Sequence, residues 1–213
     1  PVYATRLTRG LIEVKLRDAK IHDVDLRTVA ATDVLSVDPF RIEFFHVSHS
    51  IPDGVGLGIG TPAGLVVHSG DFKFDHSPVD GHRTDFAKLA ELGRRGVLLL
   101  LSDSTNSENP GYTPSERVIG ETLSRAFAAA KGRVIVATFS SNISRVQQVI
   151  DVARQHGRRV AVVGRSMVSN VRIARELGYL IVPADVLLTV QQLDQLPAHQ
   201  ATLICTGSQG EPT

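Results

Sequence analysis

The fold of the second half of the chain is decided by residues 133–163, which read RVIVATFSSNISRVQQVIDVARQHGRRVAVV. The two ends of this stretch, 133–138 and 159–163, are short runs rich in β-branched residues and predict strands. The segment between them carries one apolar stripe at helical spacing, formed by Ile143, Val146, Ile150 and Ala153. A strand, a helix and a second strand in this order predict two parallel strands joined by a crossover helix.

The same alternation extends in both directions from this stretch. Upstream, residues 85–92 have a helical pattern, and residues 97–101 (VLLLL) form an all-apolar run typical of a strand buried on both faces. A helix is predicted from Pro114 to about residue 130, because proline suits the first turn and Glu116 suits the positive end of the helix dipole. Downstream, residues 167–177 predict a helix and residues 201–205 a strand.

The first part of the chain has a different texture. Residues 7–16 predict a short helix. They are followed by short runs typical of strands, at 24–30, 34–37, 40–47, 55–60 and 65–68. Thr61-Pro62-Ala63-Gly64 predicts a tight hairpin turn between the last two. We therefore expect an α/β fold in which a sandwich-like β region precedes a parallel α/β layer.

Composition places the chain among ordinary globular proteins. It has 213 residues, of which 42% are hydrophobic and 21% charged, with a net charge of +1. The single cysteine, Cys205, excludes an internal disulfide framework and suits a reducing cytoplasm. No apolar run approaches the roughly 18 to 20 residues that cross a bilayer. We expect a cytoplasmic protein that does not contact the membrane.

Three candidate metal ligands stand where apolar strands are predicted to end. His49 follows the run at 40–47, Asp71 follows 65–68, and Asp103 follows 97–101. Strand ends are rigid mounts, and the loops beyond them leave coordination positions open to water and substrate. Each of these residues could instead be a turn former or a cap. Spacing alone leaves both interpretations open, because two or three ligands are fewer than a stable site requires.

The second half of the chain has three polar strand exits that could bind phosphate. Backbone N–H groups at a helix start, and glycines that permit close approach, favour anion binding. The alternative is helix capping by the same hydroxyl and amide groups. The candidate residues are Ser140, Ser141 and Asn142 at the first exit, Arg165 and Ser166 at the second, and Gly207, Ser208 and Gln209 at the third.

The charge distribution points in the same direction. Residues 131–176 contain nine Lys or Arg and two Asp or Glu, a net charge of +7 within a chain of +1. Such a segment favours a phosphate-rich partner. A set of solvated helix faces is the other interpretation, and the sequence does not decide between them.

Taken together, these motifs resemble those of the ribonuclease J family, a group of metallo-β-lactamase-fold nucleases with an inserted β-CASP domain. The resemblance runs through nearly the whole chain. It rests on Leu11-Ile12-Glu13, His49-Ser50-Ile51-Pro52-Asp53, Gly70-Asp71-Phe72-Lys73, Ser102-Asp103-Ser104-Thr105-Asn106, Phe139-Ser140-Ser141-Asn142, Gly164-Arg165-Ser166-Met167 and residues 205–212, CTGSQGEP.

The resemblance implies a fold, a site and an activity. Residues 1–110 would be part of a metallo-β-lactamase αββα sandwich, and residues 111–213 an incomplete Rossmann-like β-CASP domain with a parallel sheet. His49 and Asp71 would ligate a centre of two divalent ions, zinc or manganese, with Asp71 and Asp103 as catalytic residues. A metal-activated water would hydrolyse RNA phosphodiesters, in 5′-to-3′ exonuclease and endonuclease modes. The partner would be single-stranded RNA with a 5′-monophosphate, and the full-length protein would be a homo-oligomer.

The sequence also departs from the family pattern. The H-x-H-x-D-H motif, which supplies most of the metal ligands in the family, is absent, as are two later histidine motifs. We therefore expect most ligands to come from outside this segment, and the segment alone to be inactive. Two alternatives remain open: a lactamase-fold hydrolase acting on DNA or a small ester, and a non-catalytic module for RNA binding or assembly.

Overall fold

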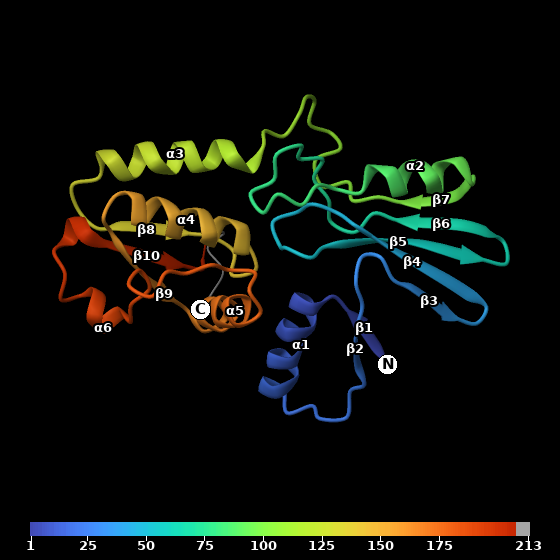
Figure 1. Ribbon diagram of the computed structural model, residues 1–213, viewed down its shortest axis with the longest axis horizontal. Coiled ribbons are helices and arrows are strands. Elements are labelled where there is room, and N and C mark those ends of the chain that lie inside the picture. Colours follow the sequence, from blue (N-terminus) through green and yellow to red (C-terminus); the bar gives the residue numbers. More distant parts are fainter. Residues whose placement is uncertain (208–213) are drawn as a thin grey trace. The chain divides into compact units, whose positions relative to one another are not determined.

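The computed structural model describes residues 1–207, and the chain divides into two compact units, Pro1–Ser115 and Glu116–Thr213. The division falls five residues after the domain boundary predicted at residue 110. Each unit contains helices and one larger sheet (Figure 1), so the chain has the predicted α/β class. Among the described residues, no helix is both long and apolar enough to cross a membrane.

The first unit is built on a five-stranded mixed sheet. The strands lie in the order β3-β4-β5-β6-β7; the first three pairs are antiparallel, and β6 and β7 are parallel. Their bounds are β3 (Val34–Val37), β4 (Phe40–His46), β5 (Val55–Thr61), β6 (Gly64–His68) and β7 (Val97–Leu101). The predicted turn at Thr61–Gly64 joins β5 to β6, with the Thr61 hydroxyl donating to the Gly64 carbonyl at 2.8 Å.

The core of this unit lies between the sheet and helix α2 (Phe86–Arg94). Its buried members are Phe45, Val47, Leu65, Val67 and Leu92. Gly58 on β5 leaves room for the helix, because a Cβ there would lie 2.9 Å from Leu92 Cδ2. The close approach of β5 to α2 therefore depends on a residue without a side chain.

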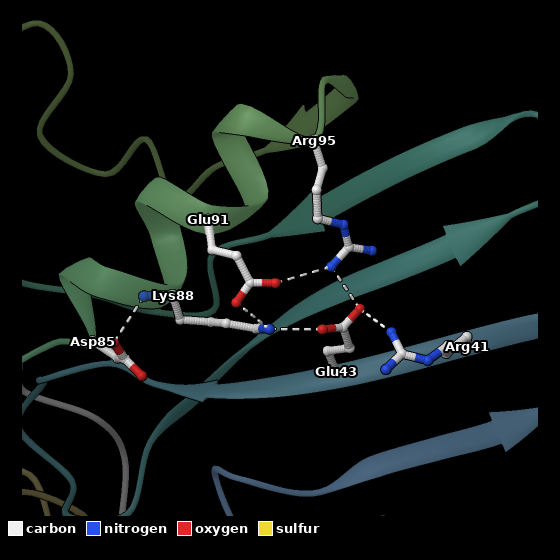
Figure 2. Close-up of polar contacts among 6 residues, drawn as sticks. All are labelled: Arg41, Glu43, Asp85, Lys88, Glu91 and Arg95. Carbon is white, nitrogen blue, oxygen red and sulfur yellow. Dashed lines mark hydrogen bonds and ion pairs between the residues drawn. The ribbon is translucent and has the colours of Figure 1, made fainter.

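A buried carboxylate, Glu43 on β4, fastens α2 to the sheet (Figure 2). Its side chain is 5% exposed. Lys88 Nζ and Arg95 Nη1 each lie 2.7 Å from a Glu43 carboxylate oxygen, and Arg41 also contacts it. Burial by itself would raise the pKa of Glu43, but the hydrogen bonds from Lys88 and Arg95 and their charges lower it from 4.5 to about 2.

Strand β7 corrects one prediction. Its apolar sequence predicted burial on both faces, yet it is the edge strand, and its residues are 38–63% exposed. Among the described residues β6 is its one strand neighbour, and packing against α2 still leaves its residues exposed. An apolar sequence indicates that a strand is suited to burial. It does not indicate whether strands or helices are present to cover both of its faces.

The beginning of the chain forms a smaller part of the first unit. Helix α1 (Arg6–Asp18) confirms the helix predicted at 7–16 and is slightly longer. Strands β1 (Val2–Ala4) and β2 (Leu26–Thr28) pair in parallel beside it. The strand predicted at 24–30 is thus present but shorter.

The second unit contains a three-stranded parallel sheet in the order β8-β10-β9. The stripe predicted on α4 is confirmed, because all four of its residues are fully buried. The short helix α6 was not predicted, since its four residues are too few for a periodic pattern. The elements are α3 (Glu116–Ala129), β8 (Val134–Ala137), α4 (Ile143–Gln155), β9 (Arg159–Val163), α5 (Arg165–Glu176), α6 (Val190–Leu193), a 3₁₀ turn (Ala198–Gln200) and β10 (Ala201–Cys205).

Candidate functional site

Three strand exits of the first unit meet at one edge of its sheet. Strands β4 and β6 are both antiparallel to β5 and so run in the same direction, and β7 is parallel to β6. Their carboxyl ends therefore point to the same edge. His49, Asp71 and Asp103 follow these ends, so the topology gathers the three predicted ligands at this edge.

Hydrogen bonds fix the exits of β6 and β7 to each other. The Ser69 N–H donates to the Leu101 carbonyl at 2.9 Å, and the Ser69 hydroxyl accepts from the Asp103 N–H at 2.9 Å. The contribution of Ser69 was not predicted, because the two exits are 34 residues apart in sequence. The backbone of Asp103 is consequently held by a residue of the β6 exit as well as by its own loop.

The Asp103 carboxylate is kept ionised by donors around it. The Thr105 hydroxyl lies 2.6 Å and the Thr105 N–H 3.0 Å from Asp103 Oδ1. The Thr105 hydroxyl is the main cause that lowers the pKa of Asp103, followed by the Thr105 N–H; the Phe72 N–H and the charge of His49 contribute less. His49 and Asp103 are therefore electrostatic neighbours.

Replacing Thr105 by valine is expected to raise the pKa of Asp103, because it removes the strongest donor to the charged form. Thr105→Ser retains a hydroxyl and is the matched control. Carboxyl carbon chemical shifts followed by NMR as a function of pH measure the difference. An Asp103 pKa that is the same in Thr105→Val and Thr105→Ser would contradict the role of the Thr105 hydroxyl.

The loop that carries His49 is anchored on both sides. The Val47 N–H donates to the Gly54 carbonyl at 3.0 Å, and the buried Ser48 donates its N–H to the Thr84 hydroxyl at 3.0 Å. The Ser48 carbonyl accepts from the Lys73 N–H at 2.7 Å. This last bond ties the His49 loop to the segment that follows Asp71.

Gly70 directs the chain into Asp71. Its φ is +62°, and a Cβ there would lie 2.7 Å from the Val55 carbonyl oxygen. Only glycine fits both the left-handed conformation and the close approach. The chain turns sharply at the end of β6, and Asp71 lies exposed at the sheet edge.

The three candidate metal ligands at this edge, His49, Asp71 and Asp103, do not complete a metal site by themselves. Their chemistry, one imidazole and two carboxylates, suits zinc or manganese. However, within residues 1–207 no group of three or more His, Cys, Asp or Glu side chains is placed to hold a metal ion. The segment described here therefore does not fit a metal centre built from its own residues alone.

The second unit gathers its polar exits in the same way. Strands β8, β9 and β10 are parallel, so the segments after them share one edge. Asn142 Oδ1 caps α4 by accepting from the Arg145 N–H at 2.9 Å, and Asn170 donates to the Ser140 carbonyl at 3.0 Å. Gly164 precedes α5 with φ +101°. Ser208 and Gln209 lie outside the described residues.

Several cations of the basic segment are already engaged within the unit. Arg145 pairs with Glu116 at 2.7 Å and Arg133 with Asp194 at 3.1 Å. Arg158 is 3% exposed and donates to the Ala130 and Gly132 carbonyls at 2.6 and 2.9 Å. The net charge of +7 therefore overstates the positive surface that this segment offers to a ligand.

Comparison with known proteins identifies relatives along the entire chain. Residues 131–213 match the family model described as "Ribonuclease J, beta-CASP domain". The chain is 47% identical to ribonuclease J of Thermus thermophilus, 42% to ribonuclease J2 of Bacillus subtilis and 46% to ribonuclease J of Mycobacterium tuberculosis, with the whole chain covered in each case. It spans 37%, 38% and 38% of the lengths of these relatives.

A solved structure has the same fold. It is titled "Crystal Structure of a Protein of Unknown Function from Enterococcus faecalis V583" and aligns with a TM-score of 0.68 at 16% identity. The alignment covers 99% of this chain and 54% of the other. At this identity the match supports the fold alone.

Proposed function

We infer, from its membership of the ribonuclease J family, that this chain is part of a ribonuclease that hydrolyses phosphodiester bonds of single-stranded RNA. The observation that carries this proposal is similarity over the whole chain at 42–47% identity. Because the chain spans little more than a third of these relatives, the proposed activity belongs to the longer protein.

The finer features of the proposal follow the family. Residues 1–110 would belong to a metallo-β-lactamase domain and residues 111–213 to a β-CASP domain. The enzyme would act in RNA processing and decay, in the cytoplasm, as a homo-oligomer, in 5′-to-3′ exonuclease and endonuclease modes, and would prefer a 5′-monophosphate. The match of residues 131–213 to a β-CASP family model supports the second assignment.

At the edge of the first sheet, we assign His49 and Asp71 as ligands of a centre of two divalent ions, and Asp71 and Asp103 as catalytic residues. Their gathering at one edge and the lowered pKa of Asp103 support this assignment. Since the described residues do not complete a metal site, we assign most of the ligands to parts of the relatives that this chain does not cover.

At the edge of the second sheet, the exits would contact the RNA backbone. The proposed contacts are made by Ser140, Ser141, Asn142, Arg165, Ser166, Gly207, Ser208 and Gln209. The shared edge of β8, β9 and β10 supports this role. Asn142 retains its amide N–H₂ as a donor while its oxygen caps α4.

The substrate class is tested with the full-length protein on RNA and DNA of one single-stranded sequence, together with a small chromogenic ester. We expect hydrolysis of the RNA and little or none of the others. Faster hydrolysis of DNA or of the ester would contradict the assignment, and salt-sensitive RNA binding without turnover would favour a non-catalytic module. Residues 1–213 alone are expected to be inactive in the same assay.

A further inference from the structure

An unassigned cluster of aromatic side chains lies in the first unit, directly after Asp71. The rings of Phe72 and Phe74 are 4.8 Å apart, those of Phe74 and Phe86 5.1 Å, and those of Phe86 and His76 5.7 Å. The last pair is stacked, with 22° between the ring planes. We call these four residues, Phe72, Phe74, Phe86 and His76, the aromatic ladder.

The outer members of the aromatic ladder face solvent. Phe74 is 52% and Phe86 38% exposed, and His76 is exposed as well, whereas Phe72 packs partly against the buried core. Folding gains little from rings left in water, because hydrophobic stabilisation scales with the apolar area that is removed from it. A contiguous exposed aromatic surface of this kind indicates a binding role.

The aromatic ladder is continuous with the candidate catalytic edge. Phe72 follows Asp71 in sequence, and its N–H contributes to the lowered pKa of the Asp103 carboxyl. The Lys73 N–H binds the Ser48 carbonyl, next to His49. The inner end of the ladder is thus fixed to the residues proposed for catalysis. Its other end, Phe86, begins α2, and the preceding Asp85 donates its N–H to the His46 carbonyl at 3.0 Å.

Cations accompany these rings. Lys73 lies between Phe72 and Phe74 in sequence, and the exposed Arg83 precedes Phe86 by three residues. Nearby carboxylates are partly engaged in local structure: Asp75 is buried and accepts from Ser77 and Ser115, and Asp85 caps α2. Exposed rings with cations near them in sequence are the combination that binds single-stranded nucleic acids, through base stacking and phosphate attraction.

We propose that the aromatic ladder is a base-stacking platform that holds one unpaired RNA base on the Phe74 and Phe86 rings, beside the cleavage site. This proposal rests on the proposed ribonuclease function. The role assigned to the ladder is positioning: it would retain RNA and align it, without taking part in bond cleavage.

The test uses the full-length protein carrying Asp71→Asn to prevent turnover, and a labelled 12-nucleotide RNA with a 5′-phosphate. Phe74→Ala and Phe74→Leu are each expected to weaken binding about tenfold, because both remove the aromatic face. Phe74→Tyr is expected to restore it. An abasic site is also introduced into the RNA at each position in turn. At one position it should strongly weaken binding to the protein with Phe74 intact, and with that RNA Phe74→Ala should cause no further loss of affinity.

The matched control is Phe40→Ala, which removes a comparably exposed phenylalanine from β4. Unchanged affinity in both Phe74→Ala and Phe74→Leu would overturn the platform, as would full binding by Phe74→Leu, because leucine preserves apolar contact without stacking. A lowered melting temperature with unchanged affinity would show instead that another protein segment covers the rings. If wild-type protein cleaves RNA while Phe74 is without effect, only the platform fails; absence of any RNA cleavage contradicts the proposed function itself.

Discussion

Replacing Asp71 by alanine in the full-length protein is expected to lower RNA cleavage by at least about 10³-fold, while RNA affinity changes by less than about threefold. Asp71 is exposed at the edge where the candidate residues gather, and Gly70 fixes its position through a turn that no other residue fits. A metal ligand contributes to the chemical step, whereas RNA binding is spread over many phosphate contacts. Single-turnover cleavage and equilibrium binding of the same RNA separate the two effects.

The control for this experiment is Asp80→Ala, which removes a second carboxylate from the loop that follows Asp71; its side chain is 26% exposed. Its cleavage rate is expected to stay within a few-fold of the wild-type rate. Asp80 accepts a hydrogen bond from the His82 N–H within the same loop, so its role is local to that loop. Substantial turnover by the Asp71 variant would refute its assignment as a ligand. An equal loss of cleavage in both variants would indicate a general effect of loop charge.

The largest expected loss of stability follows replacement of Glu43 by glutamine. The pKa of Glu43 falls from 4.5 to about 2 on folding, which corresponds to about 3 kcal/mol of stabilisation at neutral pH. Because Lys88 and Arg95 are 21% and 38% exposed, water can solvate them once the carboxylate is lost. A loss of about 2 to 3 kcal/mol is therefore expected, somewhat below that of a fully buried pair.

Hydrogen exchange measured by mass spectrometry reports this loss locally. Amides of β4 and α2 that exchange by unfolding of the unit should exchange about 100-fold faster in Glu43→Gln. Glu91→Gln is the matched control, because Glu91 contacts the same Lys88 and Arg95 but its side chain is 43% exposed. It should cost clearly less than Glu43→Gln, because water screens an exposed ion pair. Equal effects of the two substitutions would contradict the central position of Glu43.

The pH dependence has a defined sign. The folded-state pKa of Glu43 lies below its unfolded value, so the stabilisation is complete above pH 4.5 and is lost as pH falls towards 2. Protection of β4 and α2 in the wild type should decline over this range, and Glu43→Gln should show a weaker decline.

Features that depend on local periodicity could be predicted from the sequence. The buried stripe of α4 follows from the spacing of Ile143, Val146 and Ile150, and the β5–β6 hairpin follows from its turn residues. The parallel direction of the strands in the second unit could also be predicted, and with it the gathering of their exits at one edge. The order of these strands in the sheet was not predicted.

Features that depend on distant partners could not be predicted. Glu43 meets Lys88 and Arg95 across 45 and 52 residues of sequence, so no local pattern marks it as a buried charge. The exposure of β7 depends on its place at the sheet edge, which its apolar composition does not encode. The aromatic ladder likewise joins residues of one loop to the first turn of α2. The sequence shows that Asp103 follows a strand and that Thr105 lies close to it. It does not show that Ser69, 34 residues away, accepts the Asp103 N–H.

The most direct test of the central claim is hydrolysis of a single-stranded RNA by the full-length protein, assayed as purified, after removal of metal by a chelator, and after addition of Mn²⁺ or Zn²⁺. Cleavage is expected to disappear on chelation and to return with one of these ions. Absence of cleavage under all three conditions, or undiminished cleavage by protein shown by elemental analysis to contain no metal, would contradict it.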